Sequence, residues 1–335
     1  MDDEGDFVPR PPRTALPYWP PPEPPRSILA SDPDGKPNSP LTTVSVLVLV
    51  LSLVLSVALL SRDDLFHGTT AVAGSPVPAA DQPQAAGAAP RGTSPSGSTP
   101  APAPKSVLQT DTNPLLADGI GLPPTTCTLP AISRDSEQLR AYYQAAINCL
   151  DEAWRPALDR VNEPFSSPRL EITAGRSLCG EAPSAEEATA YYCSGGKVIF
   201  MPTDRLLEQA GLSQAAHLAV LAHEYGHHVQ ALSGILIAAY EKGEKFDKNS
   251  PEKLELTRRA ELQANCFSGM FIASVTGRGS ISTKLGRAAA DSFKDTVADN
   301  THGTVKHQVR WGKAGFDTNK TASCNTWTAA PDEVS

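Results

Sequence analysis

Residues 223–227 read His-Glu-Tyr-Gly-His, and this pentapeptide restricts the fold more than any other stretch of the chain. Two histidines four positions apart project from one face when the backbone is helical. Neutral imidazole is a good zinc ligand, so His223 and His227, one turn apart, can share one ion. Glu224 lies near the same face, where its carboxylate can take a proton from a metal-bound water rather than bind the metal. We therefore expect a helix that follows an N-cap at Ser213 and carries part of a zinc site.

A second helix is predicted from Pro251 to Val275, and it offers a third ligand. Glu261 and Asn265 are four residues apart on it and share one face. Two histidines and one glutamate leave the fourth zinc position for water, and Asn265 can orient a ligand histidine. The apolar side of this helix carries Ala260, Ala264, Phe267 and Phe271.

On the first helix, Gly226 is unfavourable in mid-helix by about 1 kcal/mol, which indicates that something packs closely against it.

Several blocks of the sequence, taken in order, resemble the neutral zinc metallopeptidases of bacteria. They are His-Glu-Tyr-Gly-His-His-Val-Gln at 223–230, Glu-Leu-Gln-Ala-Asn-Cys-Phe-Ser-Gly at 261–269, Thr-His-Gly-Thr at 301–304, Arg-Trp at 310–311 and Gly-Phe at 315–316. The resemblance covers roughly residues 127–327. It implies a zincin-type fold in which His223, His227 and Glu261 bind zinc and Glu224 is the catalytic base.

The resemblance also draws attention to two further residues. The family pattern usually has Asp where this chain has Asn265, and a neutral amide increases the basicity of a ligand histidine less than a carboxylate does. This keeps open a catalytically silent protein that binds zinc without turnover. His302 lies in one of the recurrent blocks, and near the zinc it could stabilise the developing oxyanion. The alternative for His302 is a structural hydrogen bond at a helix end.

Proline is distributed unevenly along the chain, since 23 of the 31 prolines fall in the first 126 residues. Residues 1–40 contain runs such as Pro-Pro-Pro-Glu-Pro-Pro and few aliphatic side chains to bury. We expect a disordered, polyproline-II-like arm. Its P-x-x-P spacing could dock an SH3- or WW-like cytoplasmic partner, and the alternative is a solvated spacer.

Residues 41–60 form an uncharged, mostly aliphatic run of 20 residues, long enough to cross about 30 Å of hydrocarbon as a helix. We expect a single transmembrane helix in the lipid bilayer of the plasma membrane. Arg26 and Lys36 precede it and Arg62 follows it, a bias that places the N-terminus in the cytoplasm and the bulk of the chain outside. Cleavage at Ala-Val-Ala, residues 71–73, is the alternative. Residues 61–126, rich in Ala, Pro, Gly and Ser, are expected to be a flexible linker.

Residues 127–329 are expected to form an α+β metallopeptidase-like domain, mainly helical with a small β-sheet, followed by a tail at 330–335. Helical patterns are found at 134–159 and 282–300 besides the two helices above. A strand is predicted at 170–173, and a hairpin at 191–201 around Ser-Gly-Gly. In zincins an edge strand near the metal often pairs with extended substrate, and this hairpin is the candidate. A purely structural strand pair is the alternative. Residues 241–250 carry mixed charge and are expected to form a solvated loop.

All six cysteines lie in this domain, which suits an oxidising compartment and three disulfides. Six cysteines allow fifteen pairings. Taking neighbours in order, we expect Cys127–Cys149, Cys179–Cys193 and Cys266–Cys324.

The charge pattern argues against nucleic acid as a partner. From residue 127 onward, 22 lysines and arginines face 25 acidic residues, with no basic stripe. Taken together, the sequence favours a membrane-anchored, extracytoplasmic zinc peptidase whose substrate is a peptide or protein, with a cell-wall peptide included. Two alternatives stay open. One is the silent zinc-binding module, and the other is an interaction protein that acts through the proline-rich arm.

Overall fold

A computed structural model describes residues 102–296 and 298–335 of the chain. The helices and strands in chain order are η1 (Pro114–Leu116), α2 (Ser136–Arg160), β1 (Arg169–Glu171), β2 (Tyr191–Cys193), β3 (Val198–Phe200), α3 (Thr203–Gln209), α4 (Gln214–Ser233), α5 (Ile235–Gly243), α6 (Pro251–Val275), α7 (Thr283–Asp291), η2 (Ser292–Asp295), α8 (Val305–Thr318), η3 (Thr321–Cys324) and η4 (Pro331–Glu333). The prediction of a mainly helical α+β fold with a small sheet is confirmed.

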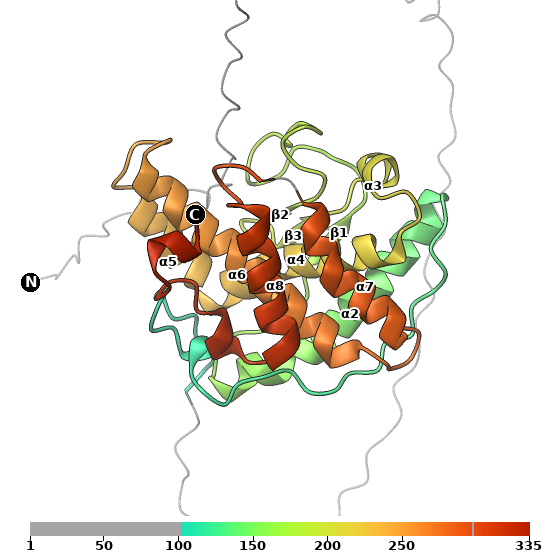
Figure 1. Ribbon diagram of the computed structural model, residues 1–335, viewed down its shortest axis with the longest axis horizontal. Helices are drawn as coiled ribbons and strands as arrows, with labels where there is room; N and C mark the ends of the chain where they lie inside the picture. The colour runs from blue at the N-terminus through green and yellow to red at the C-terminus, as the bar shows by residue number, and fades with distance from the viewer. Residues whose placement is uncertain (1–101, 297) are drawn as a thin grey trace, which may run out of the picture. The chain divides into compact units, whose positions relative to one another are not determined.

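Helix α6 is the centre of the packed core. All eleven residues from Leu262 to Ile272 are buried, so this part of the helix is enclosed on every side. Helix α4 packs along one side of α6 and α8 along another (Figure 1). Helix α2 packs against α4, and its Trp154 meets Phe267 of α6 edge to face, with ring centroids 5.0 Å apart. The predicted bounds of α6 and the N-cap at Ser213 of α4 are both confirmed.

Glycines allow α6 to approach its neighbours at backbone distance. A Cβ atom added to Gly226 of α4 would lie 2.9 Å from the carbonyl oxygen of Ala264 on α6, so the close packing expected at this glycine is confirmed. A Cβ atom on Gly269 of α6 would collide with the carbonyl oxygen of Gly312 on α8. Gly315 of α8 faces the carbonyl of Cys266 in the same way. Close interdigitation of this kind fixes the relative positions of the three helices.

The sheet has three short strands in the order β1-β3-β2. Strand β3 pairs in parallel with β1, with Leu170 opposite Ile199, and antiparallel with β2, with Tyr192 opposite Ile199. The predicted strand and hairpin are therefore present, and the hairpin places β2 at an edge of the sheet. Strands β2 and β3 both contact α4, which carries the histidine motif.

The three predicted disulfides are confirmed. The Cα atoms are 5.7 Å apart in Cys127–Cys149, 5.8 Å in Cys179–Cys193 and 5.5 Å in Cys266–Cys324. The first ties the segment before α2 to that helix, the second holds the loop that precedes β2, and the third links α6 to η3.

The packed chain extends beyond the domain boundaries expected at residues 127 and 329. Leu115 is fully buried, and Asn113 donates from Nδ2 to the carbonyl of Ser233 at 3.1 Å. The backbone N–H of Thr125 donates to Ser274 at 3.0 Å. Near the other boundary Val334 is fully buried. The residues before 127 are held in place largely by hydrogen bonds to the backbone of α4 and α6. Such bonds leave no apolar periodicity in the sequence.

Two further local expectations need correction. The helix predicted over 282–300 ends as α7 at Asp291 and continues only as the short turn η2, where Phe293 turns into the core against Gly312. The loop expected over 241–250 begins later, because α5 runs to Gly243. Helix α5 exists as a separate element since Gly234, with φ of 91°, ends α4 in the left-handed region.

Within residues 102–296 and 298–335, no helix has the length and apolarity that a bilayer crossing requires. The transmembrane helix predicted at 41–60, the arm at 1–40 and most of the linker predicted at 61–126 lie outside the described residues.

Candidate metal centre

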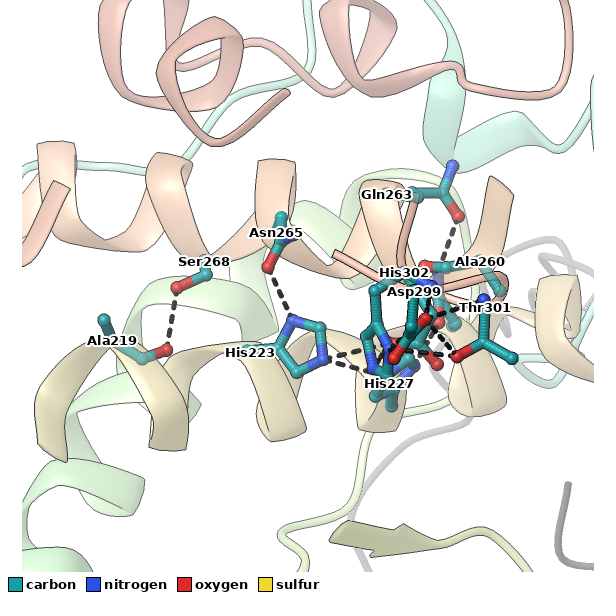
Figure 2. A network of polar contacts seen from close by, with 12 residues as sticks. Ala219, His223, His227, Ala260, Gln263, Asn265, Ser268, Asp299, Thr301 and His302 are labelled. Carbon is teal, nitrogen blue, oxygen red and sulfur yellow. Dashed lines mark hydrogen bonds and ion pairs between the residues drawn. The ribbon is translucent and has the colours of Figure 1, made fainter. Parts of the chain in front are cut away.

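Helices α4 and α6 run antiparallel and bring the predicted site residues together. Figure 2 shows Asn265 opposite His223, with Ser268 donating to the carbonyl of Ala219 at 3.1 Å one turn further along. Residue numbers rise along α4 while those of the facing residues fall along α6. Glu261 therefore lies opposite His227. The four-residue spacing on each helix thus converges on one point.

Three donor atoms meet at that point. The Nε2 atoms of His223 and His227 are 3.2 Å apart, and each is 3.2 Å from Oε2 of Glu261. Possible ligand atoms of these three residues all lie within 4.8 Å of one another, a geometry that could hold a metal ion. In the part of the chain that the structure describes, this is the one such group of histidine, cysteine and acidic side chains.

The other nitrogen of each histidine is bonded to a side-chain amide. Nδ1 of His223 lies 2.8 Å from Oδ1 of Asn265, and Nδ1 of His227 lies 2.9 Å from Oε1 of Gln230. An amide oxygen only accepts, so each Nδ1 carries the hydrogen in these bonds and each Nε2 of a neutral ring presents a lone pair. Two nitrogen lone pairs and a carboxylate oxygen therefore face one another. Two nitrogens and one oxygen are a donor set that zinc accepts.

A buried chain of amides fixes the orientation of Gln230. Its Nε2 donates to the carbonyl of Ala260 at 2.8 Å and to Oε1 of Gln263 at 3.0 Å. Gln263 in turn donates to the carbonyl of Cys324 at 3.0 Å. Both glutamines are fully buried. The acceptor end of Gln230 is thereby held towards His227, as expected of a group that orients a metal ligand.

The electrostatics of the cluster favour an added positive charge. Burial opposes a charge on His227, but the carboxylate of Glu261 outweighs it and raises the pKa of the imidazole to about 9. Burial acts against ionisation of Glu261 as well, yet the neighbouring histidines hold its pKa well below the ordinary value. A protein site with this balance binds either a proton or a cation.

Glu224 lies beside the cluster without joining it. Its side chain is buried, and burial raises the pKa of its carboxyl. The residue follows His223 directly and lines the same cavity as the three donor groups.

His302 and Asp299 approach the cluster from the loop before α8. Nε2 of His302 lies 3.6 Å from Oε2 of Glu261, and its Nδ1 lies 2.9 Å from Oδ2 of Asp299. Asp299 is itself held, since its Oδ1 accepts hydrogen bonds of 2.7 Å from the hydroxyl and N–H of Thr301 and from the N–H of His302. Burial opposes a charge on His302, but Glu261 and Asp299 raise its pKa to about 9. The loop therefore presents a cationic imidazole to the cluster.

The remaining histidines of the folded part do not join the cluster. His228 follows His227 but points to Tyr192, whose hydroxyl is 2.9 Å from Nδ1, and to the carbonyl of Ser166, 2.7 Å from Nε2. Burial lowers its pKa to about 4. His217 bonds to Tyr143 and the carbonyl of Gly211, and His307 bonds to Thr304 and Ser335, as expected of structural residues.

The cluster opens into a cavity of about 750 Å³. Its walls come from α4, α5 and α6, from the segment 185–194 that includes most of β2, and from the segment 292–302 with His302. A cavity of this size, with a group of converging polar side chains and a largely apolar surface, is typical of a ligand site.

The family of the chain follows from comparison with known sequences. A family model described as "Putative neutral zinc metallopeptidase" matches residues 123–327. The chain belongs to this family. The resemblance of the sequence blocks to neutral zinc metallopeptidases is thereby confirmed, and the site residues named above all lie inside the matched range.

Relatives of the chain are found in Mycobacterium tuberculosis and Escherichia coli. The uncharacterized protein Rv2575 of Mycobacterium tuberculosis (strain H37Rv) is 29% identical over 249 residues, which cover 66% of this chain and 80% of that protein. The uncharacterized protein YpfJ of Escherichia coli (strain K12) is 25% identical over 224 residues, which cover 59% of this chain and 74% of that protein. No solved structure matches the chain.

Sequence reasoning missed two residues of the site. Gln230 lies three positions after His227 on the same helix. A polar side chain at that spacing, on a face predicted to be buried, could have predicted its contact with His227. Asp299 lies three positions before His302, but the helix predicted over 282–300 would have directed it elsewhere. The contact between Asp299 and His302 depends on the turn that follows η2.

Proposed function

We propose that this chain is a zinc-dependent peptidase that hydrolyses peptide bonds. The observation that carries the proposal is the convergence of two Nε2 lone pairs and a carboxylate oxygen, each histidine being oriented through Nδ1 by an amide. His223, His227 and Glu261 are the proposed ligands, and the family of the chain supports zinc as the metal.

When bound, zinc supplies Lewis acidity that polarises the scissile carbonyl and lowers the pKa of a water molecule. Glu224 is the proposed general base, and the rise in its pKa on burial makes its carboxylate a better proton acceptor. It takes a proton from the attacking water as the C–O bond forms, and then gives that proton to the leaving amine as the C–N bond breaks. His302 donates from Nε2–H to the developing oxyanion, while Asp299 holds its ring.

Strand β2 is the proposed docking edge for an extended substrate. It pairs only with β3 among the described strands, and most of it lines the cavity. An added peptide strand can hydrogen-bond to such an edge through its backbone.

We propose further that the enzyme is anchored in the plasma membrane by residues 41–60 and works outside the cytoplasm. The three cysteine pairs support an oxidising compartment. A peptidase held on the outer face would meet cell-wall peptides as well as proteins, and the proline-rich arm would be left inside to meet a partner.

The metal content of the full-length chain tests the proposal first. We expect near-stoichiometric zinc in the protein purified under oxidising conditions and a sharp loss in Glu261→Ala. Glu224→Gln should retain zinc and lose hydrolysis of a peptide library. A folded, metal-free protein would refute the metal site, and full chelator-sensitive activity of Glu224→Gln would refute the assigned base.

Asn265 supports a second candidate, a zinc-binding module without turnover. The residue that faces His223 is an amide, whereas the resemblance implies an aspartate there. This candidate predicts bound zinc but no cleavage of any peptide, and a gain of hydrolysis in Asn265→Asp would identify the amide as the cause.

A further inference from the structure

The cavity continues past the metal cluster on both sides. Along α4 its lining runs from Ser213 to His227, and on the other side it continues onto α5 and the start of α6. Ser213 precedes His223 by ten residues, which is about 15 Å at the rise of an α-helix. An extended peptide covers that length with about four residues. The cluster thus lies within the cleft rather than at a closed end.

The α5 side of the cleft has an apolar wall. Leu236 and Ile237 of α5 and Leu256 of α6 line it, and all three side chains are partly exposed. None of them packs against the hydrophobic clusters formed by the described residues. Apolar surface of this kind gains free energy when another apolar group covers it.

The described lining lacks the lysine or arginine side chain that usually holds the carboxylate at the end of a peptide, and its His302 faces the metal cluster. Among the described residues that line the cavity there is no lysine or arginine, whereas Glu186, Glu187 and Asp295 add negative charge to the lining. A terminal carboxylate would be repelled there, and Arg or Lys is the usual partner of such a group.

We infer that the substrate is the interior of an extended peptide, with a bulky apolar side chain seated against Leu236, Ile237 and Leu256. This inference rests on the proposed function, because it names the substrate class of the same site. The open cleft admits chain on both sides of the bond, the wall selects the side chain, and the absence of lysine and arginine from the described lining removes any preference for a C-terminal carboxylate.

Binding to the Glu224→Gln form of the full-length chain tests the inference without turnover. The probes are fluorescent nonapeptides of Gly, Ala and Ser, blocked at both ends, with Leu, Ala, Lys or Glu at the centre. We expect the Leu peptide to bind about tenfold more tightly than the Ala peptide. Adding Ile237→Asp should abolish that preference and improve binding of the Lys peptide. Leu256→Asp, on the other helix, repeats the test should the first variant unfold.

Leu212→Asp is the matched control, since Leu212 is 45% exposed and does not line the cavity. It should leave the preference unchanged. Equal binding of all four peptides, or an unchanged preference in both wall variants, would overturn the apolar subsite. A peptide with a free C-terminal carboxylate that binds tenfold better than its amide would overturn the preference for chain interior. Selective binding without cleavage by the unsubstituted, zinc-loaded protein would support the subsite and overturn the proposed hydrolysis.

Discussion

Replacing Glu163 by glutamine should remove a large part of the pH dependence of folding stability. Glu163 follows α2, is fully buried, and has no hydrogen-bond partner for either carboxyl oxygen among the described residues. Burial raises the pKa of its carboxyl from the ordinary 4.5 to about 8. The two values differ by about 3.5 pH units, which corresponds to about 5 kcal/mol.

The direction in which the free energy of unfolding changes with pH follows from proton uptake. Below pH 4.5 the carboxyl is protonated in both the folded and the unfolded state, so no charge is buried and the free energy of unfolding is not lowered. As the pH rises, the unfolded chain loses its proton first while the folded chain keeps it to about pH 8, so the free energy of unfolding falls across that interval. Above it the loss is complete and constant. Urea unfolding followed by tryptophan fluorescence between pH 4 and 9, with disulfides intact and a chelator present, measures the profile.

Glu163→Gln should be more stable than the unsubstituted protein at pH 8, and the difference should shrink or reverse towards pH 5. The control is Glu152→Gln on the exposed face of α2, which should leave the profile unchanged. Parallel profiles for Glu163→Gln and the unsubstituted protein would refute the reasoning, because they would mean that the carboxyl ionises at the same pH in both states.

Substitutions at three other positions test the core and the site. Gly269→Ala should lower the free energy of unfolding by about 1–3 kcal/mol or more, since its Cβ meets the backbone of α8, whereas Gly175→Ala, with no atom within 4 Å, should be close to neutral in thermal unfolding. Asp299→Asn should lower kcat by about tenfold or more with unchanged KM and zinc content, because His302 loses the charge that holds its ring and its proton. Asn265→Leu should weaken zinc binding by about 10–100-fold, and Asn265→Asp should strengthen it in a competition assay with a chromogenic chelator.

The central part of the site could be predicted because its residues lie at helical spacing within short stretches of the sequence. His223 and His227 on one helix, and Glu261 and Asn265 on another, each obey the four-residue rule, so a face-to-face pair of helices was enough to join them. The bounds of α6 followed from Pro251 at the first position and from its apolar pattern. These signals need no knowledge of the rest of the chain.

The rest depends on contacts between distant residues. Asn113 donates a hydrogen bond to Ser233, 120 positions away. The segment around Asn113 is polar and contains proline, and it has no sequence pattern that predicts this contact. Helix α7 stops short because Phe293 finds a place beside Gly312 on α8, which is a tertiary preference that overrides helical periodicity. Asp299 reaches His302 only through that early stop.

The enclosed position of α6 makes the two sides of the cleft unequal in stiffness. Helix α6 cannot slide without driving its backbone into Gly226 of α4 or Gly312 of α8, so Glu261 stands on a rigid support. Helix α5 is set apart from α4 by Gly234, and its Leu236 and Ile237 face the cleft rather than the core. Under the proposed function, substitutions in α5 would change which peptides the cleft accepts and leave the metal ligands in place. Under the same proposal, peptide preference would be free to diverge through α5 between related proteins while the metal ligands stay the same.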